Sequence, residues 1–143
     1  MRNALLAVVV LVCAAFGDEV SDRAKLLGAW RPAESTPKDA GTWKLESRGN
    51  DALRVTQSLG DQTLLAFECT TNGQECDVKD SGKAAKVSLY FNGSKLVEWE
   101  TRGKQVVKRR FGIAEDGTTL EVEVIPITAA GKAETLRFHR AEP

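Results

Sequence analysis

Arg109 is the residue whose type and setting point most directly to chemistry. Its segment alternates in character, so its guanidinium shares one face with the apolar Phe111 and Ile113. A tight turn at 116–117 would place it opposite another apolar residue, Val124. A charge on a buried face is costly unless paired, so Arg109 should hold a carboxylate, a carbonyl or an anionic ligand. Two interpretations stay open: a structural arginine, paired with a glutamate or reaching solvent, and an arginine that anchors a ligand.

The neighbour of Arg109 depends on how tightly the chain turns at residues 102–104. A three-residue turn would let the guanidinium stack on Trp99. A tighter turn would instead place Glu98 directly opposite Arg109. The sequence therefore offers either an aromatic or an acidic partner for this arginine.

The face on which Glu98 lies depends in turn on the loop at residues 92–94. We prefer a three-residue loop, because it sets Val87 opposite Trp99, whereas a two-residue loop would set Val87 opposite Glu98. In the preferred register Trp99 points into the protein, and Glu98 and Glu100 point outward.

Cys69 and Cys76 are the two cysteines outside the N-terminal apolar segment. A two-residue turn at Asn72-Gly73 would place them directly opposite each other, within the Cα separation that a disulfide spans. An even count in an exported chain also favours a disulfide, although two buried, unpaired thiols remain the alternative. Zinc would need further ligands, and the single histidine, His139, is far away in the sequence. We predict a Cys69–Cys76 disulfide and no metal.

The sequence shows no arrangement of residues suited to catalysis. The disulfide would leave no cysteine nucleophile, and no serine sits on a strand–turn–helix elbow. Acid–base catalysis needs carboxylates aimed into a cavity, but Glu98, Glu100, Glu121 and Glu123 fall on outward positions. His139 shares the outward face of its own segment. We therefore predict no catalytic residues, no cofactor and no enzymatic activity.

Residues 1–17 have the pattern of a secretory signal peptide. A basic residue, Arg2, precedes an apolar run over 4–16. Small residues occupy positions −3 and −1, Ala15 and Gly17, relative to a predicted cleavage before Asp18. The run is shorter than the roughly 20 residues of a membrane-crossing helix, which disfavours a retained anchor. Lipidation of Cys13 is disfavoured because the bulky Val12 precedes it. We expect a secreted or periplasmic protein with no membrane span after cleavage.

The remaining chain, residues 18–143, has the length of one domain that can bury a sufficient core. The whole chain carries 20 basic and 20 acidic residues, and the leader removes only the basic Arg2. This near balance, without a basic stripe, disfavours nucleic acid as a partner. We see no linker or second domain.

A short helix precedes a chain that alternates with period two. Ser21 or Asp22 can cap the helix, Leu26 and Leu27 form its apolar face, and Gly28 ends it. Strands are expected at 29–34, 42–47, 52–58, 63–70, 75–79, 85–91, 95–101, 105–113, 119–125 and 133–140. The connections between them carry turn residues and are too short for crossover helices. The pattern predicts an all-β, antiparallel up-and-down meander of about 8–10 strands, folded as a barrel or a sandwich.

The predicted interior follows from the alternation and the preferred registers. It comprises Trp43, Leu45, Leu53, Val55, Leu65, Phe67, Val87, Leu89, Phe91, Val97, Trp99, Val107, Phe111, Ile113, Leu120, Val122, Val124, Leu136 and Phe138. Trp30, at the entry to the first strand, is expected to close the base of the barrel. Arg137 or Arg140 could then lie over its ring as a cation–π cover.

Two stretches of the chain carry a family resemblance. Segment 27–35 reads LGAWRPAES, and in segment 108–120 a strand with two arginines leads through an Asp-Gly turn into a Leu-led strand. In these features, and over most of residues 22–142, the chain resembles small secreted bacterial proteins described as lipocalin-like, which are largely uncharacterised. The resemblance implies a calycin-type barrel in which an interior cavity can form, and it carries over no ligand or catalytic residue. The Cys69–Cys76 pair is not part of the pattern.

Together these features predict an exported protein that binds a small apolar or amphiphilic molecule inside a lipocalin-like barrel. The candidate ligand-binding residues are Arg109, Trp99, Phe111 and Phe67, while Trp30 and Gly28 have structural roles. The alternative is a protein-interaction or envelope structural module whose barrel is filled by its own side chains and holds no ligand.

Overall fold

The computed structural model describes residues 16–80 and 83–141. The elements are α1 (Phe16–Lys25), β1 (Gly28–Pro32), η1 (Lys38–Ala40), β2 (Thr42–Arg48), β3 (Ala52–Leu59), β4 (Gln62–Thr70), β5 (Asn72–Asp80), β6 (Lys83–Asn92), β7 (Lys95–Arg102), β8 (Gln105–Ile113), β9 (Leu120–Pro126) and β10 (Glu134–Arg140). Most of the predicted signal peptide lies outside the described residues. None of the described helices is long and apolar enough to cross a membrane.

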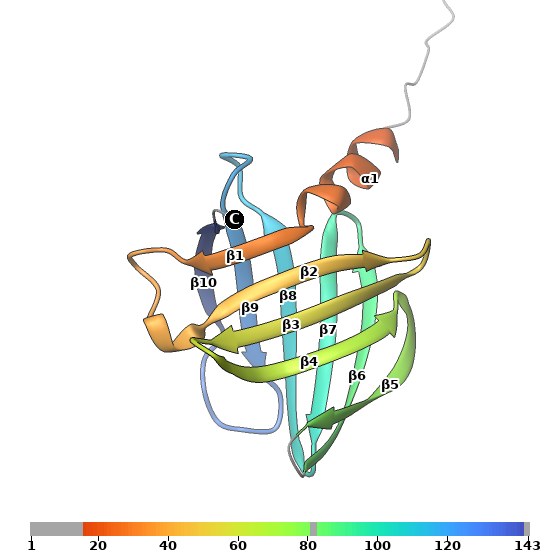
Figure 1. Cartoon of the computed structure of the whole chain (residues 1–143), viewed down its shortest axis with the longest axis vertical. Helices are drawn as coiled ribbons and strands as arrows, with labels where there is room; N and C mark the ends of the chain where they lie inside the picture. The colour runs from red at the N-terminus through yellow and green to blue at the C-terminus, as the bar shows by residue number, and fades with distance from the viewer. Residues whose placement is uncertain (1–15, 81–82, 142–143) are drawn as a thin grey trace, which may run out of the picture.

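Ten antiparallel strands form one sheet in the order β4-β3-β2-β1-β10-β9-β8-β7-β6-β5. The chain runs as a meander within each half, and β1 pairs with β10 to join the halves. Figure 1 shows β2, β3 and β4 crossing steeply in front of β7 and β8, so the sheet folds over into two layers. The predicted all-β, antiparallel barrel with a short N-terminal helix is therefore confirmed, and the barrel is nearly closed.

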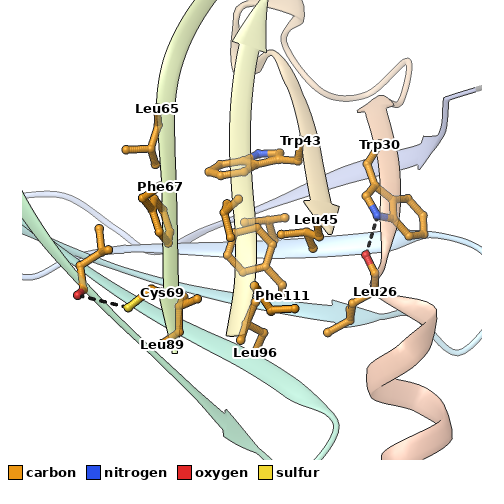
Figure 2. Close-up of a cluster of buried hydrophobic side chains, with 14 of the residues drawn as sticks. Leu26, Trp30, Trp43, Leu45, Leu65, Phe67, Cys69, Leu89, Leu96 and Phe111 are labelled. Carbon is orange, nitrogen blue, oxygen red and sulfur yellow. Dashed lines mark hydrogen bonds between the residues drawn. The ribbon is translucent and has the colours of Figure 1, made fainter. Parts of the chain in front are cut away.

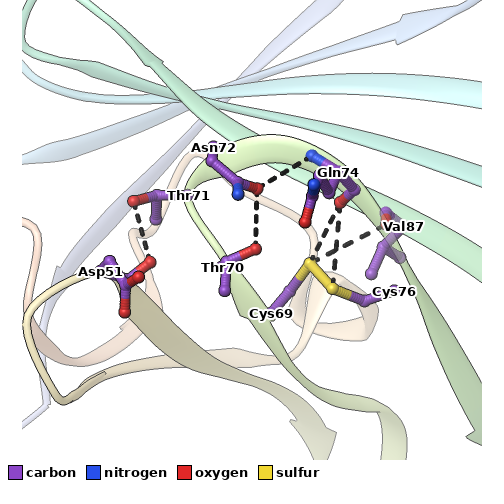
Figure 3. Close-up of a disulfide and its surroundings, with 8 residues drawn as sticks. All are labelled: Asp51, Cys69, Thr70, Thr71, Asn72, Gln74, Cys76 and Val87. Atoms are coloured by element: carbon purple, nitrogen blue, oxygen red, sulfur yellow. Dashed lines mark hydrogen bonds between the residues drawn. A yellow bond between two sulfur atoms is a disulfide. The ribbon is translucent and has the colours of Figure 1, made fainter.

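The barrel has a seam where the edge strands β4 and β5 meet. The predicted disulfide is present there, with the Cα atoms of Cys69 and Cys76 5.7 Å apart (Figure 3). The predicted hairpin is wrong: Asn72 already begins β5, and β4 and β5 form no hydrogen-bonded ladder in the part of the chain that is described. The reason is that β4 pairs with β3 and β5 pairs with β6, in different layers. The disulfide thus joins strands that share no ladder.

Helix α1 covers one end of the barrel and is attached at several points. The Arg23 Nε donates a hydrogen bond of 2.8 Å to the carbonyl of Gly93, in the β6–β7 turn. Leu26, only 2% exposed, enters the core, and the Trp30 indole N–H donates to its carbonyl at 2.9 Å (Figure 2). The Arg140 guanidinium lies 4.3 Å from the centre of the Trp30 ring. Trp30 therefore has the buried, arginine-covered position that the sequence predicts.

Gly28 lies where the chain passes from α1 into β1, the first strand of the barrel. Its φ of 124° suits glycine, and a Cβ there would lie 2.8 Å from the Arg140 Nη1. The same guanidinium donates from Nη1 to the Leu27 carbonyl and from Nη2 to the Lys25 carbonyl. Arg140 thus satisfies carbonyls at the end of α1, where a helix leaves acceptors unpaired.

Two tight turns fix which face of β7 is buried. Gly93, with a φ of 62°, takes the first central position of a two-residue turn, as a type II′ turn requires. The same arrangement recurs at Gly103, with a φ of 57°. The preferred three-residue loop at 92–94 is therefore wrong. The pairing of Val87 with Glu98 that a two-residue loop was expected to give is wrong as well, since Val87 faces Glu100. The tighter alternative at 102–104 is confirmed. As a result Glu98 pairs with Leu89 on one side and with Arg109 on the other.

This register reverses the predicted faces of β7. Glu98 is 0% and Glu100 7% exposed, because both point inward, where the sequence predicts outward positions. Trp99 lies on the opposite, outer face and is half-buried. Val97 shares that outer face, yet it is only 1% exposed. A slip of one residue in a hairpin exchanges every side chain of a strand between faces, which explains the whole set of differences.

The β8–β9 hairpin has the predicted register, with Arg109 opposite Val124 and Phe111 opposite Val122. The buried core consists of Leu26, Trp30, Trp43, Leu45, Leu53, Val55, Leu65, Phe67, Cys69, Val78, Ala85, Val87, Leu89, Leu96, Phe111, Leu120, Val122 and Phe138. Phe91, Ile113, Val124 and Leu136 pack against it as partly buried residues. Apart from the β7 residues and Val107, which is half-buried, the predicted interior residues therefore belong to this core or its margin.

Candidate functional site

A group of four charged side chains lies on β7 and β8, largely inside the barrel. We call Glu98, Glu100, Arg102 and Arg109 the interior polar cluster. The Arg109 Nη1 donates to the Glu98 Oε1 at 2.9 Å and to the Glu100 Oε2 at 2.8 Å. The Arg102 Nε donates to the Glu100 Oε1 at 2.8 Å. The tight turn at 103–104 creates this group, because it sets Glu98 directly opposite Arg109.

The two carboxyl groups of the cluster differ in environment. The Glu98 side chain is fully buried, and burial raises its pKa above the ordinary value, against the opposing charge of Arg109. Burial acts in the same direction on Glu100, but Arg109 and Arg102 outweigh it and lower the pKa of Glu100. The carboxylates in turn raise the pKa of Arg109, although its burial acts to lower it. Of the two carboxyl groups, Glu100 therefore loses its proton more readily, and it pairs with both arginines.

The Glu98 Oε2 is the one carboxylate oxygen of the cluster that has no partner among the described residues. Both oxygens of Glu100 and the Oε1 of Glu98 accept hydrogen bonds from arginine. The Glu98 Oε2 is buried and accepts none. Most buried polar atoms in proteins are hydrogen-bonded, so an oxygen of this kind calls for an explanation.

Aromatic side chains adjoin the cluster within the barrel. The Arg109 guanidinium carbon lies 5.6 Å from the centre of the Trp43 ring, and Trp43 contacts Phe111 edge-on with ring centres 5.1 Å apart. Figure 2 shows Trp43, Phe111 and Phe67 within one cluster of buried side chains. Of the predicted ligand-binding residues, Arg109, Phe111 and Phe67 therefore all belong to the barrel interior.

Trp99, the fourth predicted ligand-binding residue, is placed elsewhere. On the outer face of β7 its indole N–H donates to the Tyr90 hydroxyl at 3.4 Å, and the Lys108 ammonium lies 5.0 Å from its ring centre. Of the two alternatives for the partner of Arg109, stacking on Trp99 is wrong, since the two side chains lie on opposite faces of the sheet. Trp43 takes the place beside Arg109 instead.

Solvent contacts the inward face at the end of the barrel opposite α1. Along β8, Phe111 is 0% exposed, the Arg109 side chain is 15% exposed and Val107 is half-buried. On β7 the Glu98 side chain is 0% and the Glu100 side chain 9% exposed. We call this the open end, and the α1-covered end the closed end. The interior polar cluster lies between the packed core and the open end.

Sequence reasoning missed Glu98 and Glu100 as site residues. The tighter alternative for the 102–104 turn could have identified Glu98, because it puts Glu98 opposite Arg109, the one arginine on an apolar face. Trp43 was expected only as core, and nothing in the sequence places it near Arg109. No group of three or more His, Cys, Asp or Glu side chains suited to a metal occurs within residues 16–80 and 83–141.

The fold is similar to that of several small β-barrel proteins of known structure. A secretory abundant heat soluble protein from Ramazzottius varieornatus matches with a TM-score of 0.66 and 12% identity, covering 82% of this chain and 96% of that one. A Schistosoma mansoni fatty acid binding protein, solved in complex with arachidonic acid, matches with a TM-score of 0.60 and 19% identity, covering 85% and 99%. The fluorescent protein UnaG matches with a TM-score of 0.60 and 20% identity, covering 82% and 98%.

At these identities the similarity establishes the fold and leaves the ligand open. No protein-family model matches the sequence, and no curated protein matches it.

Proposed function

We propose that the protein is an exported binding protein for a small apolar or amphiphilic molecule, held inside the barrel with its polar end at the interior polar cluster. One observation carries the proposal. In a barrel interior lined mainly by apolar side chains, the Glu98 Oε2 is buried without a hydrogen-bond partner among the described residues. A bound molecule with a polar end would supply that partner, and its apolar part would contact the aromatic side chains beside the cluster.

The energetics of the cluster support the same conclusion. Replacing a buried ion-pair group by packed apolar side chains is often neutral or stabilising by about 1–4 kcal/mol. Stability alone therefore gives no reason for two carboxylates and an arginine to lie inside this barrel. A role in recognising a ligand does give one, because a few polar groups in an apolar pocket fix orientation and specificity.

Each site residue has a role in the proposal. Arg109 holds the two carboxylates in position, since its Nη1 donates to both of them. Trp43, Phe67 and Phe111 contact the apolar part of the cargo. The site binds and carries no reaction. The fold likeness is consistent with this role, since the Schistosoma protein holds arachidonic acid.

Export is proposed on two features of the chain. The first 17 residues have the pattern of a signal peptide. The Cys69–Cys76 disulfide suits an oxidising compartment outside the cytosol. The two features are independent, and both fit a secreted or periplasmic protein.

The second candidate is a module without cargo whose barrel is filled by its own side chains. The close packing of the closed end favours it, since Leu26, Trp30, Leu89, Leu96 and Phe111 are at most 2% exposed. In this case the molecule would act through its outer surface, and the interior polar cluster would serve only to hold β7 against β8.

Native mass spectrometry of protein isolated from its host decides between the two candidates. We expect a bound small molecule that is lost on denaturation. The same protein, stripped of cargo, should bind the neutral dye Nile red saturably, with a blue-shifted emission. A host-derived protein without any bound molecule, together with no saturable binding of dye or amphiphile, would overturn the proposal in favour of a filled barrel.

A further inference from the structure

The hydrogen bonds of the interior polar cluster specify what its ligand must offer. Glu100 uses one oxygen for Arg109 and the other for Arg102. Glu98 uses Oε1 for Arg109, which leaves its Oε2 as the buried position without a partner. A ligand whose polar end lies at this position therefore meets a buried carboxyl oxygen that can accept a hydrogen bond.

An anionic ligand would be opposed by the charges already present. Both hydrogens on the Arg109 Nη1 are engaged by carboxylates, and the Arg102 Nε is engaged by Glu100. A carboxylate beside the Glu98 Oε2 would place a third negative charge close to Glu98 and Glu100. These two carboxylates would repel it, and it could accept a hydrogen bond at the Glu98 Oε2 only if Glu98 took up a proton, which weakens its binding.

A hydroxyl group meets no such obstacle. Its O–H can donate to an ionised Glu98 Oε2, and its oxygen can accept from a protonated one. It therefore satisfies the buried oxygen in both protonation states and adds no charge to the interior. Primary alcohols and glycerol monoesters with a single acyl chain combine such a group with an apolar tail.

We propose that the barrel binds an uncharged, hydroxyl-bearing amphiphile, with the hydroxyl on the Glu98 Oε2, in preference to a carboxylate with the same tail. The inference rests on the proposed function, because it assumes that a ligand occupies the interior. It assigns Glu98 as the residue that determines specificity and Arg109 as the residue that positions it.

Displacement of Nile red by dodecanol and by dodecanoate, near neutral pH, tests the inference with two ligands matched in tail. We expect dodecanol to bind the wild-type protein about tenfold more tightly, the equivalent of one hydrogen bond made or charge clash avoided. Glu98→Gln keeps the shape and hydrogen bonding but removes the charge, so it should strengthen dodecanoate binding and leave dodecanol binding nearly unchanged. Glu98→Met should remove the preference while retaining affinity for both tails.

The outcomes separate failure of the inference from failure of the proposed function. Wild-type protein that binds dodecanoate as tightly as dodecanol, or a Glu98→Gln variant with the unchanged wild-type ratio, would overturn the inference and leave a binding protein. If neither ligand nor the dye binds the wild-type barrel, the proposed function fails as well. Circular dichroism and thermal melting establish that each variant is folded, and Glu98→Gln alone suffices if Glu98→Met is not.

Discussion

Glu98 and Glu100 are two carboxyls two residues apart that the fold places in opposite situations. Glu98 is fully buried with one arginine bond, whereas Glu100 is bonded by two arginines and lies nearer the open end. Their pKa values are displaced in opposite directions, as in sites where neighbouring carboxyls have separate roles. The two residues should therefore respond differently to loss of charge.

We expect Glu98→Gln to leave the free energy of unfolding near neutral pH unchanged or raise it by about 1 kcal/mol, and Glu100→Gln to lower it by about 2–3 kcal/mol. A raised folded-state pKa means that the stability contributed by Glu98 is present below its unfolded pKa and is lost as pH rises through the folded value. Glu100 has the opposite sign, so its contribution is lost as pH falls. Urea unfolding of both variants, near neutral pH and near pH 4.5, measures the contrast. Equal losses in the two variants would contradict it.

Asp116 gives a second pH-dependent prediction, at the β8–β9 turn. The Thr119 hydroxyl and the backbone N–H groups of Thr118 and Thr119 bind its carboxylate and lower its pKa to about 2. Its contribution to stability is thus complete above the unfolded pKa of about 4 and is lost as pH falls toward 2. Asp116→Asn should melt at a lower temperature near neutral pH and lose less on acidification than the wild type. Glu115→Gln, at the neighbouring exposed position, is the matched control and should follow the wild-type curve.

At the scale of elements, the disulfide connects two strands that no hydrogen-bonded ladder joins among the described residues, whereas ladders connect the other neighbouring strands of the sheet. Cys69 and Cys76 connect the edge strands β4 and β5, which belong to different layers. Thr71, between them, is held to the β2–β3 turn through two bonds to the Asp51 carbonyl. These two hydrogen bonds therefore fix the chain next to the disulfide, where it passes from β4 to β5.

Replacing both cysteines by serine should lower the free energy of unfolding by about 2–3 kcal/mol, the range for a short disulfide loop. Because the seam lacks a ladder, we also expect amide exchange to accelerate in β4 and β5 while β8 and β9 keep their protection. Chemical denaturation and hydrogen exchange read by mass spectrometry measure the two effects. Wild-type protein under reducing conditions is the control and should match the double variant. Uniformly faster exchange across the sheet would show that the disulfide does not act locally.

The strands illustrate what the sequence can and cannot predict. The β8–β9 register follows from the Asp116-Gly117 turn, which sets Phe111 opposite Val122 with both on the buried face. The β6–β7 register does not, since segment 92–94 permits two loop lengths that differ by one residue. Judged alone, β7 has its more apolar face at Val97 and Trp99. The alternation thus favours the wrong face.

Tertiary structure decides the β7 register through contacts that no local pattern contains. The tight turns on both sides of β7 act together, and the resulting inward face brings Glu98 and Glu100 to Arg109. The hydrogen bonds of that guanidinium offset part of the cost of burying the carboxylates. The seam was missed for a similar reason: Asn72-Gly73 resembles a hairpin turn, yet the two strands diverge into separate layers.

At the scale of the whole molecule, the barrel has unlike ends. Helix α1 and Trp30 fill the closed end, where the core side chains are inaccessible to solvent. Toward the open end the inward residues become charged and partly exposed, from Glu98 to Glu100 on β7 and from Phe111 to Val107 on β8. If the protein carries a cargo, this asymmetry has the cargo enter from the open end and reach the cluster and the aromatic side chains beside it, because the closed end is filled by well-packed side chains.

Enlarging an inward side chain at the open end tests that placement. Val107 lies opposite the inward Glu100, and its neighbour Val106 points to the other face of the same strand, so the two valines form a matched pair. We expect Val107→Phe to fold and to weaken Nile red binding about tenfold or more, since the added ring occupies the space that the cargo uses, whereas Val106→Phe should bind as the wild type does. A Val107→Phe variant destabilised by about 1–3 kcal/mol with intact dye binding would instead show that the open half is already packed and that the dye binds elsewhere. Thermal melting beside the dye titration distinguishes these results, because a ring that fills empty space costs little stability and a ring forced into a packed interior costs a great deal.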